Sequence, residues 1–207
     1  AEVGVIKNAD GSAYFQIGGT TAYAAVYGPR ELHPKFMQNP RKGLLRCNYN
    51  MMPFSGAGDR VKPGTSRRSK EISSVTTQAL EPVVDLSEYP NAVVDVFIEL
   101  SETDAGSRCA GICAASMALA HAGLSMKQLV SAVAVGKVGD KIVLDLSGDE
   151  EHFEGGSTDI ATAILPQTGE ISLLQLDGEV SPKELFACIE MARKAAKELY
   201  EVQKSAL

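Results

Sequence analysis

The sequence of 207 residues lacks the features that mark membrane, secreted and disulfide-rich proteins. No apolar run approaches the roughly 20 residues that a membrane helix needs. The first residues read as a strand. They lack the charged segment followed by an apolar segment that marks a signal peptide. Only four cysteines occur, at positions 47, 109, 113 and 188, and their spacing gives no disulfide framework. We therefore expect a protein of the reducing cytoplasm with no membrane partner.

Common catalytic and metal-binding motifs are also missing. The segment Ala134–Val138 lacks the first glycine and the Ser or Thr of a P-loop, and no GxGxxG unit, serine elbow or HExxH is present. Cys109 and Cys113 share one helix face, but only three scattered histidines and two further cysteines remain to complete a zinc site. We interpret both cysteines as small packing residues, and His121 as a packing or helix C-terminal residue.

The net charge is −6, yet the charges are unevenly distributed. Between Arg30 and Lys70, ten Lys or Arg residues accompany two acids, Glu31 and Asp59, so this segment carries +8. The remaining residues hold ten basic and twenty-four acidic side chains, which amounts to −14. Such asymmetry favours a local surface for a polyanion on an otherwise acidic protein. The alternative is a basic loop that is merely solvated.

Hydrophobic residues make up 44% and charged residues 22%, which is typical of a globular chain. Alternation and turn residues predict strands over residues 3–7, 12–17, 21–27, 44–52, 93–100, 131–146 (two strands), 160–165 and 170–176. The third strand should end at Gly28-Pro29, because proline cannot extend a ladder. Start and stop signals predict helices over about 66–81 and 106–123, a short helix opening at Ser125, and a helix of about 22 residues after Ser181. The sequence therefore predicts one α/β domain of the α+β kind, with mixed sheets, packed helices and a long C-terminal helix.

The stretch TDAGSRCAGICAAS, residues 103–116, has the composition of an anion-binding helix start. Unpaired N–H groups and the helix dipole favour an anion there, Gly106 permits close approach, and Ser107 and Arg108 add donors. The alternative is that Ser107 only caps the helix while Arg108 pairs with Asp104. Spacing alone does not separate these two interpretations.

A second helix start, Ser66–Ile72, carries Arg67, Arg68 and Lys70, although cations there oppose the helix dipole. Two helix starts that place arginines against this rule suggest an anion held between them. They are distant in sequence, so the fold must bring them together.

Acidic residues cluster between Asp145 and Asp159, with no Lys or Arg among them. Solvation of a surface loop explains most of this cluster. Asp159, however, stands immediately before the apolar run Ile160–Ile164, and Asp145 lies inside the strand-like KIVLDL, so both carboxylates should be rigidly held. Near a phosphate site, such a pair could bind Mg²⁺ or take part in proton transfer.

Eight ordered blocks along nearly the whole chain resemble the RNase PH family. They are NADGSAY, AAVYGPRELHPK, RRSKEIS, DVFIELSETDAGSR, ALAHAGLSM, VGKVGDKIVLDLS, TDIATAILP and LLQLDGEVSPKEL. The similarity is greatest to the catalytic subunits of archaeal exosomes, above all through YGPRELHP and the C-terminal half. The resemblance implies a single RNase PH-like domain over residues 1–207. It also implies phosphorolysis, in which inorganic phosphate as co-substrate attacks the last phosphodiester of an RNA 3′ end and releases a nucleoside diphosphate.

The resemblance assigns roles to residues at matching positions. It implies that the catalytic residues, which would also hold Mg²⁺ or Mn²⁺, are Asp159 and Asp145. The phosphate site would comprise Gly106, Ser107, Arg108 and Arg68. The arginines that contact RNA would be Arg67, Arg30, Arg46 and Arg60.

The family's hexameric rings imply partners as well. These would be the 3′ end of single-stranded RNA, a second RNase PH-like subunit in the ring, and RNA-binding cap subunits. Two alternatives are a non-catalytic RNA-binding subunit of such a ring and a homohexameric RNase PH that trims tRNA 3′ ends. The chain departs from the family in lacking an opening Arg-x-Asp-Gly-Arg segment, so we expect the natural chain to begin earlier. It also has a longer acidic loop, with Glu151 where an aspartate is common.

Overall fold

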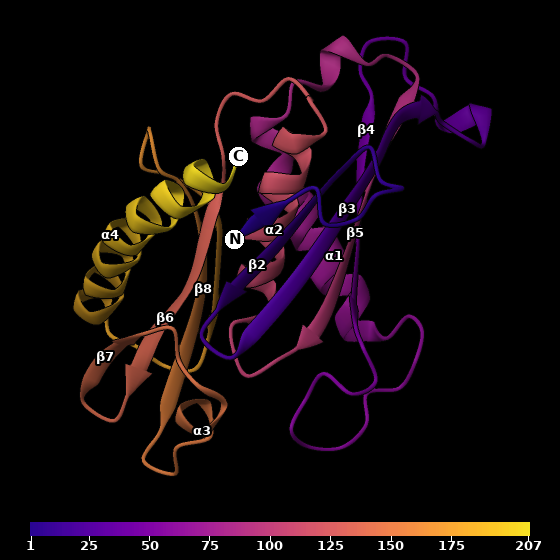
Figure 1. Cartoon of the computed structure of the whole chain (residues 1–207). Helices are drawn as coiled ribbons and strands as arrows, with labels where there is room; N and C mark the ends of the chain where they lie inside the picture. Colours follow the sequence, from indigo (N-terminus) through magenta and orange to yellow (C-terminus); the bar gives the residue numbers. More distant parts are fainter.

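The computed structural model describes all 207 residues, which form two β-sheets on either side of a central helix, α2 (Figure 1). The first sheet has the strand order β1-β2-β3-β5-β4, in which only β4 and β5 run parallel. Its strands are β1 (Glu2–Val3), β2 (Gly11–Ile17), β3 (Thr20–Glu31), β4 (Leu44–Met51) and β5 (Ala92–Glu102). The second sheet is antiparallel throughout, in the order β7-β6-β8-β9. Its strands are β6 (Ser131–Val138), β7 (Lys141–Leu144), β8 (Ser157–Leu165) and β9 (Glu170–Asp177).

Four α-helices accompany the sheets, namely α1 (Arg67–Leu80), α2 (Ser107–His121), α3 (Gly148–Glu151) and α4 (Pro182–Ala206). Short 3₁₀ turns cover Lys35–Met37, Glu81–Val83 and Leu86–Glu88. Helix α1 packs on β4 beside α2, and α4 covers the outer face of the second sheet (Figure 1). None of the helices combines the length and the apolar character that a membrane crossing requires. The predicted class, with mixed sheets, packed helices and a long C-terminal helix, is confirmed.

Helix α2 is the centre of the core because its small side chains let both sheets approach it. Twelve of its fifteen residues are buried, so it has no solvent-facing stripe. Ala110, Ala114 and Ala118 belong to one cluster of 34 buried residues, which joins Ile98 of the first sheet to Ala134 of the second. A continuous core therefore crosses both sheets and fixes the position of the N-terminal end of α2.

The four cysteines are free and buried, and Cys109 and Cys113 are therefore the packing residues that the sequence predicts. The Cys113 thiol donates to the carbonyl oxygen of Ala132 at 3.3 Å and accepts from the N–H of the same residue at 3.1 Å, which attaches α2 to β6. Burial raises the pKa of the Cys113 thiol to about 12. His121 is exposed, and it accepts a hydrogen bond at Nδ1 from the backbone N–H of Ser12 at 3.2 Å, which joins the end of α2 to β2.

Several predicted helix boundaries are confirmed by their cap geometry. Ser66 begins α1 by accepting the N–H of Ser69, whose own hydroxyl accepts the N–H of Ser66. Gly123 follows the end of α2 with a φ of +74°, a conformation that favours glycine. Ser181 and Glu184 form the predicted capping box at the start of α4. Local sequence chemistry therefore places these boundaries correctly.

The prediction that β3 ends at Gly28-Pro29 is wrong. The strand passes through these residues to Glu31, with a register shift between Tyr27 and Arg30, after which it pairs again with β5. A bulge of this kind leaves residues out of the ladder, so Pro29 removes no required hydrogen bond.

The predicted short helix at Ser125 is also wrong, because a neighbouring segment uses its backbone groups. The carbonyl oxygen of Ser125 accepts the N–H of Asp85 at 2.9 Å, and the N–H of Lys127 donates to the carbonyl oxygen of Val83 at 2.8 Å. Met126 forms an isolated bridge with Val84. The segment is therefore held by tertiary pairing in spite of its helical signal.

The first and acidic segments also differ from the prediction. The strand expected over residues 3–7 is reduced to β1, because the N–H of Ile6 donates to the hydroxyl of Ser12 at 2.9 Å and does not join the ladder. The acidic segment contains the short helix α3, and β8 begins at Ser157, earlier than expected. Asp159 therefore lies inside a strand and not before it.

Gly11 begins β2 where this strand approaches the C-terminal end of α2. A Cβ atom there would lie 2.4 Å from both the carbonyl oxygen of Ala118 and the backbone nitrogen of Ala122. We expect Gly11→Ala to lower the free energy of unfolding by about 1–3 kcal/mol, the usual cost of overpacking, in a urea titration. Gly58→Ala is the matched control, because a Cβ atom there would meet no atom within 4 Å apart from those of Gly58 and its two chain neighbours. Equal stabilities of the two variants would contradict the close packing of β2 on α2.

Candidate active site

A polar cavity of about 340 Å³ lies where the starts of α1 and α2 meet α3, β8 and the end of β9. No apolar side chain lines it, and its walls comprise Arg68, Arg108, Glu151, His152, Ser157, Asp159, Asp177 and Gly178. Charged groups of both signs from segments distant in sequence thus face one volume. The predicted candidates Arg68, Arg108 and Asp159 are brought together here.

Arg108 lies in the first turn of α2, and two other elements hold its guanidinium group. Its Nη1 atom forms an ion pair with Oε1 of Glu71 on α1 at 3.6 Å and donates a hydrogen bond to Oε1 of Gln175 on β9. Gln175 in turn donates from Nε2 to Oε1 of Glu71 at 3.0 Å. The alternative pairing of Arg108 with Asp104 is wrong, because Asp104 accepts the backbone N–H of Gly148 at 2.7 Å. The position of Arg108 is therefore fixed jointly by α1, α2 and β9.

Gly106 and Ser107 shape the turn before Arg108 but do not line the cavity. Gly106 precedes the helix with φ +60° and ψ 20°, a left-handed conformation that favours glycine. The buried hydroxyl of Ser107 accepts a hydrogen bond from the hydroxyl of Tyr49 at 2.9 Å. The alternative in which Ser107 caps the helix is wrong, because no side chain caps the start of α2. Any phosphate contact made by Gly106 or Ser107 would therefore use their backbone N–H groups.

Arg68 lies in the first turn of α1, is exposed, and has no acidic partner within ion-pair distance. It lines the polar cavity and also an adjacent cavity of about 250 Å³ that includes Tyr49 and Lys62. Arg67 is exposed but lines neither of these cavities. Of the two neighbouring arginines, Arg68 is therefore the one directed to the site.

Asp159 is the third residue of β8 and lies opposite Gly136 and Asp177 in the ladder. Its Oδ1 atom is buried and has no hydrogen-bond partner. Burial raises the pKa of Asp159, and Asp177 adds to this rise while Arg108 opposes it. An unpartnered carboxylate oxygen with a raised pKa is suited to hold a proton or to bind a cation.

Asp145 does not join Asp159 in the cavity, so the predicted pair of carboxylates is not formed. Asp145 follows β7 with a left-handed φ of +56°, and its carboxylate lies over the backbone of Gly18. Burial raises the pKa of Asp145, and the nearby Asp104 adds to the rise. The Asp145 carboxylate therefore lies between the β2–β3 turn and Gly106, because a Cβ atom at Gly106 would lie 3.7 Å from its Oδ1 atom.

Two other carboxylates, Glu151 and Asp177, accompany Asp159 and were missed as candidates. Burial raises the pKa of Glu151, and Asp159 adds to the rise while Arg68 opposes it. Asp177 could have been found from the sequence, because the register of the β8–β9 hairpin places it opposite Asp159. Glu151 could not, because its position depends on α3, in a segment expected to be an acidic loop.

The oxygen atoms of Glu151 and Asp159 suit a hard divalent cation. Mg²⁺ commonly takes one or two carboxylates and completes its coordination with water and phosphate oxygens. No group of three or more His, Cys, Asp or Glu side chains is close enough to bind a metal by itself. The unpartnered Oδ1 atom of Asp159 fits a site shared with phosphate. Glu151, and not Asp145, lies with Asp159 in the polar cavity, and these two carboxylates fit the cation that the family resemblance implies.

The remaining predicted arginines lie outside the cavity and differ in their partners. Arg46 forms two hydrogen bonds with the carboxylate of Asp95, at 2.6 and 3.0 Å. Arg30 forms an ion pair with Asp10 at 3.6 Å. Both charges are thus partly neutralised on the first sheet. Arg60, in contrast, is exposed in the loop before α1 and has no acidic partner.

Two consecutive family models match the chain, domain 1 of the 3′ exoribonuclease family (RNase PH) over residues 1–125 and domain 2 over residues 128–195. The chain therefore belongs to the 3′ exoribonuclease family, and the predicted family resemblance is confirmed. In the sequence, the boundary between the two matches lies after β5, the last strand of the first sheet, and before β6, the first strand of the second sheet. The core cluster around α2 nevertheless includes residues of both matches.

Relatives of known name are similar along the whole chain. The exosome complex component Rrp41 of Thermococcus gammatolerans is 52% identical over 206 residues, which cover 100% of this chain and 82% of the relative. The component of the same name from Methanopyrus kandleri is 47% identical over 206 residues, which cover 100% of this chain and 85% of the relative.

Solved structures confirm the fold. Rrp46 of rice (Oryza sativa) superimposes with a TM-score of 0.85 at 23% identity, covering 98% of this chain and 90% of that chain. The Archaeoglobus fulgidus exosome with RNA bound to the active site superimposes with a TM-score of 0.80 at 23% identity, covering 97% of this chain and 85% of that chain. At this identity the matches establish the shared architecture alone.

The raised pKa of Asp159 predicts that its charge costs stability. The folded state binds the proton more tightly than the unfolded state, so stability falls as the pH rises through the interval above the ordinary aspartate pKa of about 3.9. We expect Asp159→Asn to be more stable than the parent at neutral pH, by on the order of 1 kcal/mol. The difference should vanish at acidic pH, where Asp159 is protonated in both states.

This stability difference is best measured by urea denaturation across pH, with a metal chelator and without phosphate. Asp140→Asn, in the exposed turn between β6 and β7, removes the same charge and serves as the control. If Asp159→Asn is less stable than the parent at neutral pH, then the carboxylate of Asp159 is a net stabilising group and the inference that its charge costs stability is wrong.

Proposed function

We propose that this chain is the phosphorolytic subunit of an exosome, a 3′→5′ exoribonuclease that uses inorganic phosphate to release nucleoside diphosphates from RNA 3′ ends. One observation carries the proposal. Arg68 and Arg108, from the starts of two helices, share a polar cavity with the unpartnered carboxylate of Asp159. Relatives named exosome complex component Rrp41, which are similar over the whole chain, support it.

Inorganic phosphate would bind between Arg68 and Arg108, because guanidinium groups donate paired hydrogen bonds to phosphate oxygens. Arg108 is already held by Glu71 and Gln175, so it loses little side-chain freedom when phosphate binds. The first N–H groups of α2 have no side-chain cap and can add donors. Arg68 has no acidic partner that phosphate must displace.

In the proposed reaction, a phosphate oxygen attacks the phosphorus of the last phosphodiester, and a new P–O bond forms as the P–O3′ bond breaks. The electron pair of the broken bond stays on the 3′ oxygen, which takes up a proton and becomes the new RNA 3′ hydroxyl. Asp159 is suited to supply this proton because burial raises its pKa. Arg68 and Arg108 offset the charge of the transferring phosphoryl group.

The balance of charge in the cavity favours a further cation or proton. Three carboxylates accompany two guanidinium groups there, so an incoming phosphate meets net negative charge. Glu151 and Asp159 are the residues that would hold Mg²⁺ or Mn²⁺, and such a cation, when bound, supplies positive charge to the phosphate oxygens. The proton and the cation are alternative ways to neutralise Asp159, because cation binding favours the ionised carboxylate.

RNA would reach the cavity along residues 60–70. In the basic segment, four cations have acidic partners and are partly neutralised: Arg30 with Asp10, Lys35 with Glu31, Lys42 with Glu81, and Arg46 with Asp95. The cations without such partners lie mainly just before and inside the start of α1: Arg60, Lys62, Arg67, Arg68 and Lys70. Unpaired cations bind the phosphate backbone in a sequence-tolerant and salt-dependent way.

The proposal includes an assembly in the cytoplasm. We propose a hexameric ring in which this chain alternates with a second RNase PH-like subunit, together with RNA-binding cap subunits. The names of the relatives as exosome components support a multi-subunit assembly. The Archaeoglobus fulgidus exosome, which shares the fold and has RNA bound to its active site, supports an RNA substrate.

Arg108 provides the sharpest test of the phosphate site. We expect Arg108→Ala to raise the phosphate concentration needed for half-maximal RNA degradation by about tenfold or more, because a charge-assisted contact worth about 1.5–3 kcal/mol is lost. The measurement is the initial rate of the assembled, active complex against phosphate concentration. Arg41→Ala, an exposed arginine outside the cavity, is the control. An unchanged phosphate dependence would remove Arg108 from the site.

The RNA path is tested with two double variants that remove equal charge. Arg60→Ala with Lys62→Ala should weaken binding of a single-stranded oligoribonucleotide and lower the slope of log affinity against log salt by about 1.4, because each lost phosphate contact on a single strand lowers it by about 0.7. Arg30→Ala with Arg46→Ala should leave the slope near that of the parent, because both arginines already pair with aspartates. The opposite ranking would place the RNA path on the outer face of the first sheet.

A further inference from the structure

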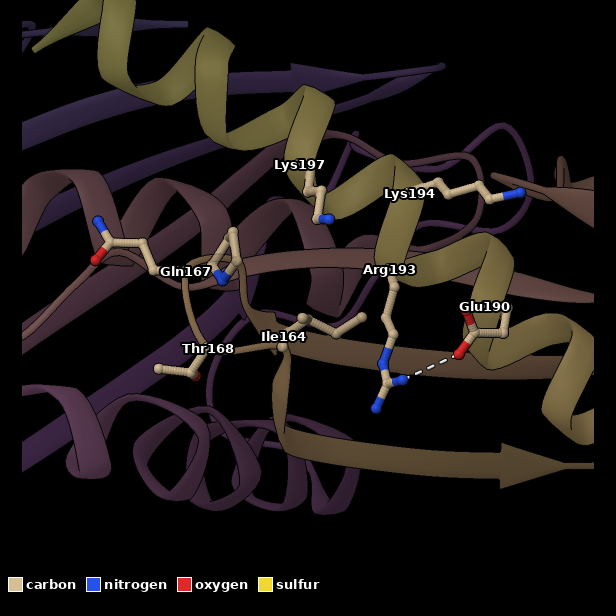
Figure 2. Close-up of a pocket in the computed structure, with 9 residues that line it drawn as sticks. Ile164, Gln167, Thr168, Glu190, Arg193, Lys194 and Lys197 are labelled. Atoms are coloured by element: carbon tan, nitrogen blue, oxygen red, sulfur yellow. Dashed lines mark hydrogen bonds and ion pairs between the residues drawn. The ribbon is translucent and has the colours of Figure 1, made fainter.

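A second concave site lies between α4 and the turn that joins β8 to β9 (Figure 2). Its volume is about 460 Å³. Ile164 is its only aliphatic side chain, and the other lining residues are Pro166, Gln167, Thr168, Gly169, Glu190, Arg193, Lys194 and Lys197. Ile164 is five positions after Asp159 on β8, roughly 17 Å along the strand. The site is therefore separate from the catalytic cavity.

The packing of α4 on the second sheet fixes which of its side chains reach this site. Ala192, Ala195 and Ala196 are buried against the sheet. Arg193 and Lys197 are four residues apart and therefore share a flank of the helix beside this buried stripe. Figure 2 shows both side chains directed from α4 into the space beside Ile164. Two cations are thus held over the same turn by the packing of the alanines.

The charges of the site are not balanced within the chain. Arg193, Lys194 and Lys197 contribute three positive charges, and Glu190 contributes one negative charge, which leaves +2 on a protein whose net charge is −6. Glu190 is used by Arg193, whose Nη1 atom donates to Oε1 at 2.9 Å. Lys194 and Lys197 have no acidic partner within ion-pair distance. The lysines therefore remain free to bind an anion.

The absence of ion pairs at the lysines is informative because suitable acids are near in sequence. Glu198 and Glu201 follow Lys194 and Lys197 by four residues, a spacing at which opposite charges on a helix commonly interact. Neither pair is formed. The positive charge of α4 is also near its middle, so the helix dipole, whose effect is confined to the end turns, does not account for it.

The opposite wall is rigid, because the β8–β9 turn is tied to its neighbours. The N–H of Gln167 donates to Oε1 of Gln128 at 3.1 Å, and its Nε2 atom donates to the hydroxyl of Tyr200 at 2.9 Å. The N–H of Gly169 closes the turn on the carbonyl oxygen of Leu165 at 2.7 Å. The concave shape between this turn and α4 is therefore formed before any ligand binds.

We propose that this site binds a phosphate oxyanion. Arg193 offers the planar donor fork that matches phosphate oxygens, and the two lysines add point charges. The excess of +2 would be balanced by a phosphate dianion or by two neighbouring phosphodiesters. The site already contains one carboxylate, that of Glu190, which is bound to Arg193. The ligand is either free inorganic phosphate or the backbone of a single-stranded nucleic acid. The proposal does not depend on the catalytic function of the other cavity.

Lysine footprinting tests this site without any turnover. The full chain is acetylated briefly with a succinimidyl ester, and modification at each lysine is measured by mass spectrometry. One arm contains inorganic phosphate, a second contains an oligoribonucleotide with unphosphorylated ends in phosphate-free buffer, and a reference contains chloride at equal ionic strength. We expect phosphate, the oligoribonucleotide or both to reduce acetylation of Lys194 and Lys197 severalfold. Lys183 and Lys204, on α4 outside the site, are the internal controls and should not change.

The two anion arms identify the source of the ligand. Protection by phosphate alone assigns a site for a small anion, and protection by the oligoribonucleotide alone assigns a contact with the nucleic-acid backbone. Arg193→Gln should abolish the protection in either arm while leaving the melting temperature close to that of Lys183→Gln. Protection of all four lysines alike, or of none, would overturn the proposal, and so would full protection in Arg193→Gln.

Discussion

The enclosure of helix α2 between two sheets is the constraint that positions the site. Because Ala110, Ala114 and Ala118 are small, β-strands from both sheets contact the helix closely, and its N-terminal turn cannot shift independently of either sheet. Arg108 therefore emerges at a fixed point beside β8 and β9. A larger side chain in this contact would separate the sheets and move Arg108 relative to Asp159. The geometry of the site therefore depends on the packing of the core.

The two sides of the cavity differ in how well their charges are satisfied. Arg108 is held by Glu71 and Gln175, whereas the buried Oδ1 atom of Asp159 has no partner. Positioning a cation in advance lowers the entropic cost of binding phosphate, and an unsatisfied carboxylate retains affinity for a proton or a metal ion. The cost in stability is tolerable because the surrounding core is continuous across both sheets. This combination suits phosphoryl transfer, in which positioning and charge neutralisation dominate catalysis.

Local sequence patterns predict most helices and strands, and three of the candidate residues that they single out, Arg68, Arg108 and Asp159, line one cavity. Capping residues such as Ser66 and Ser181 mark the starts of α1 and α4 correctly. Predictions from local patterns are wrong where long-range pairing decides the structure. At Ser125, for example, the backbone carbonyl oxygen accepts a hydrogen bond from the N–H of Asp85, in a segment distant in sequence. Asp145 shows the same limit, because periodicity places it near a strand end but does not give its left-handed φ of +56° after β7. The proximity of Asp177 to Asp159 could be predicted from the register of the β8–β9 hairpin. The proximity of Glu151 to Asp159 could not, because it depends on the position of α3.

The identity of the nucleotide released from an RNA 3′ end is the decisive test of phosphorolysis by this chain. RNA labelled in its last nucleotides is incubated with the chain assembled with its partner subunits, with and without inorganic phosphate, and the products are separated by chromatography. We expect nucleoside diphosphates that form only when phosphate is present, because phosphate is the attacking group. Nucleoside monophosphates released at the same rate without phosphate would show that water is the nucleophile and would contradict the proposed function.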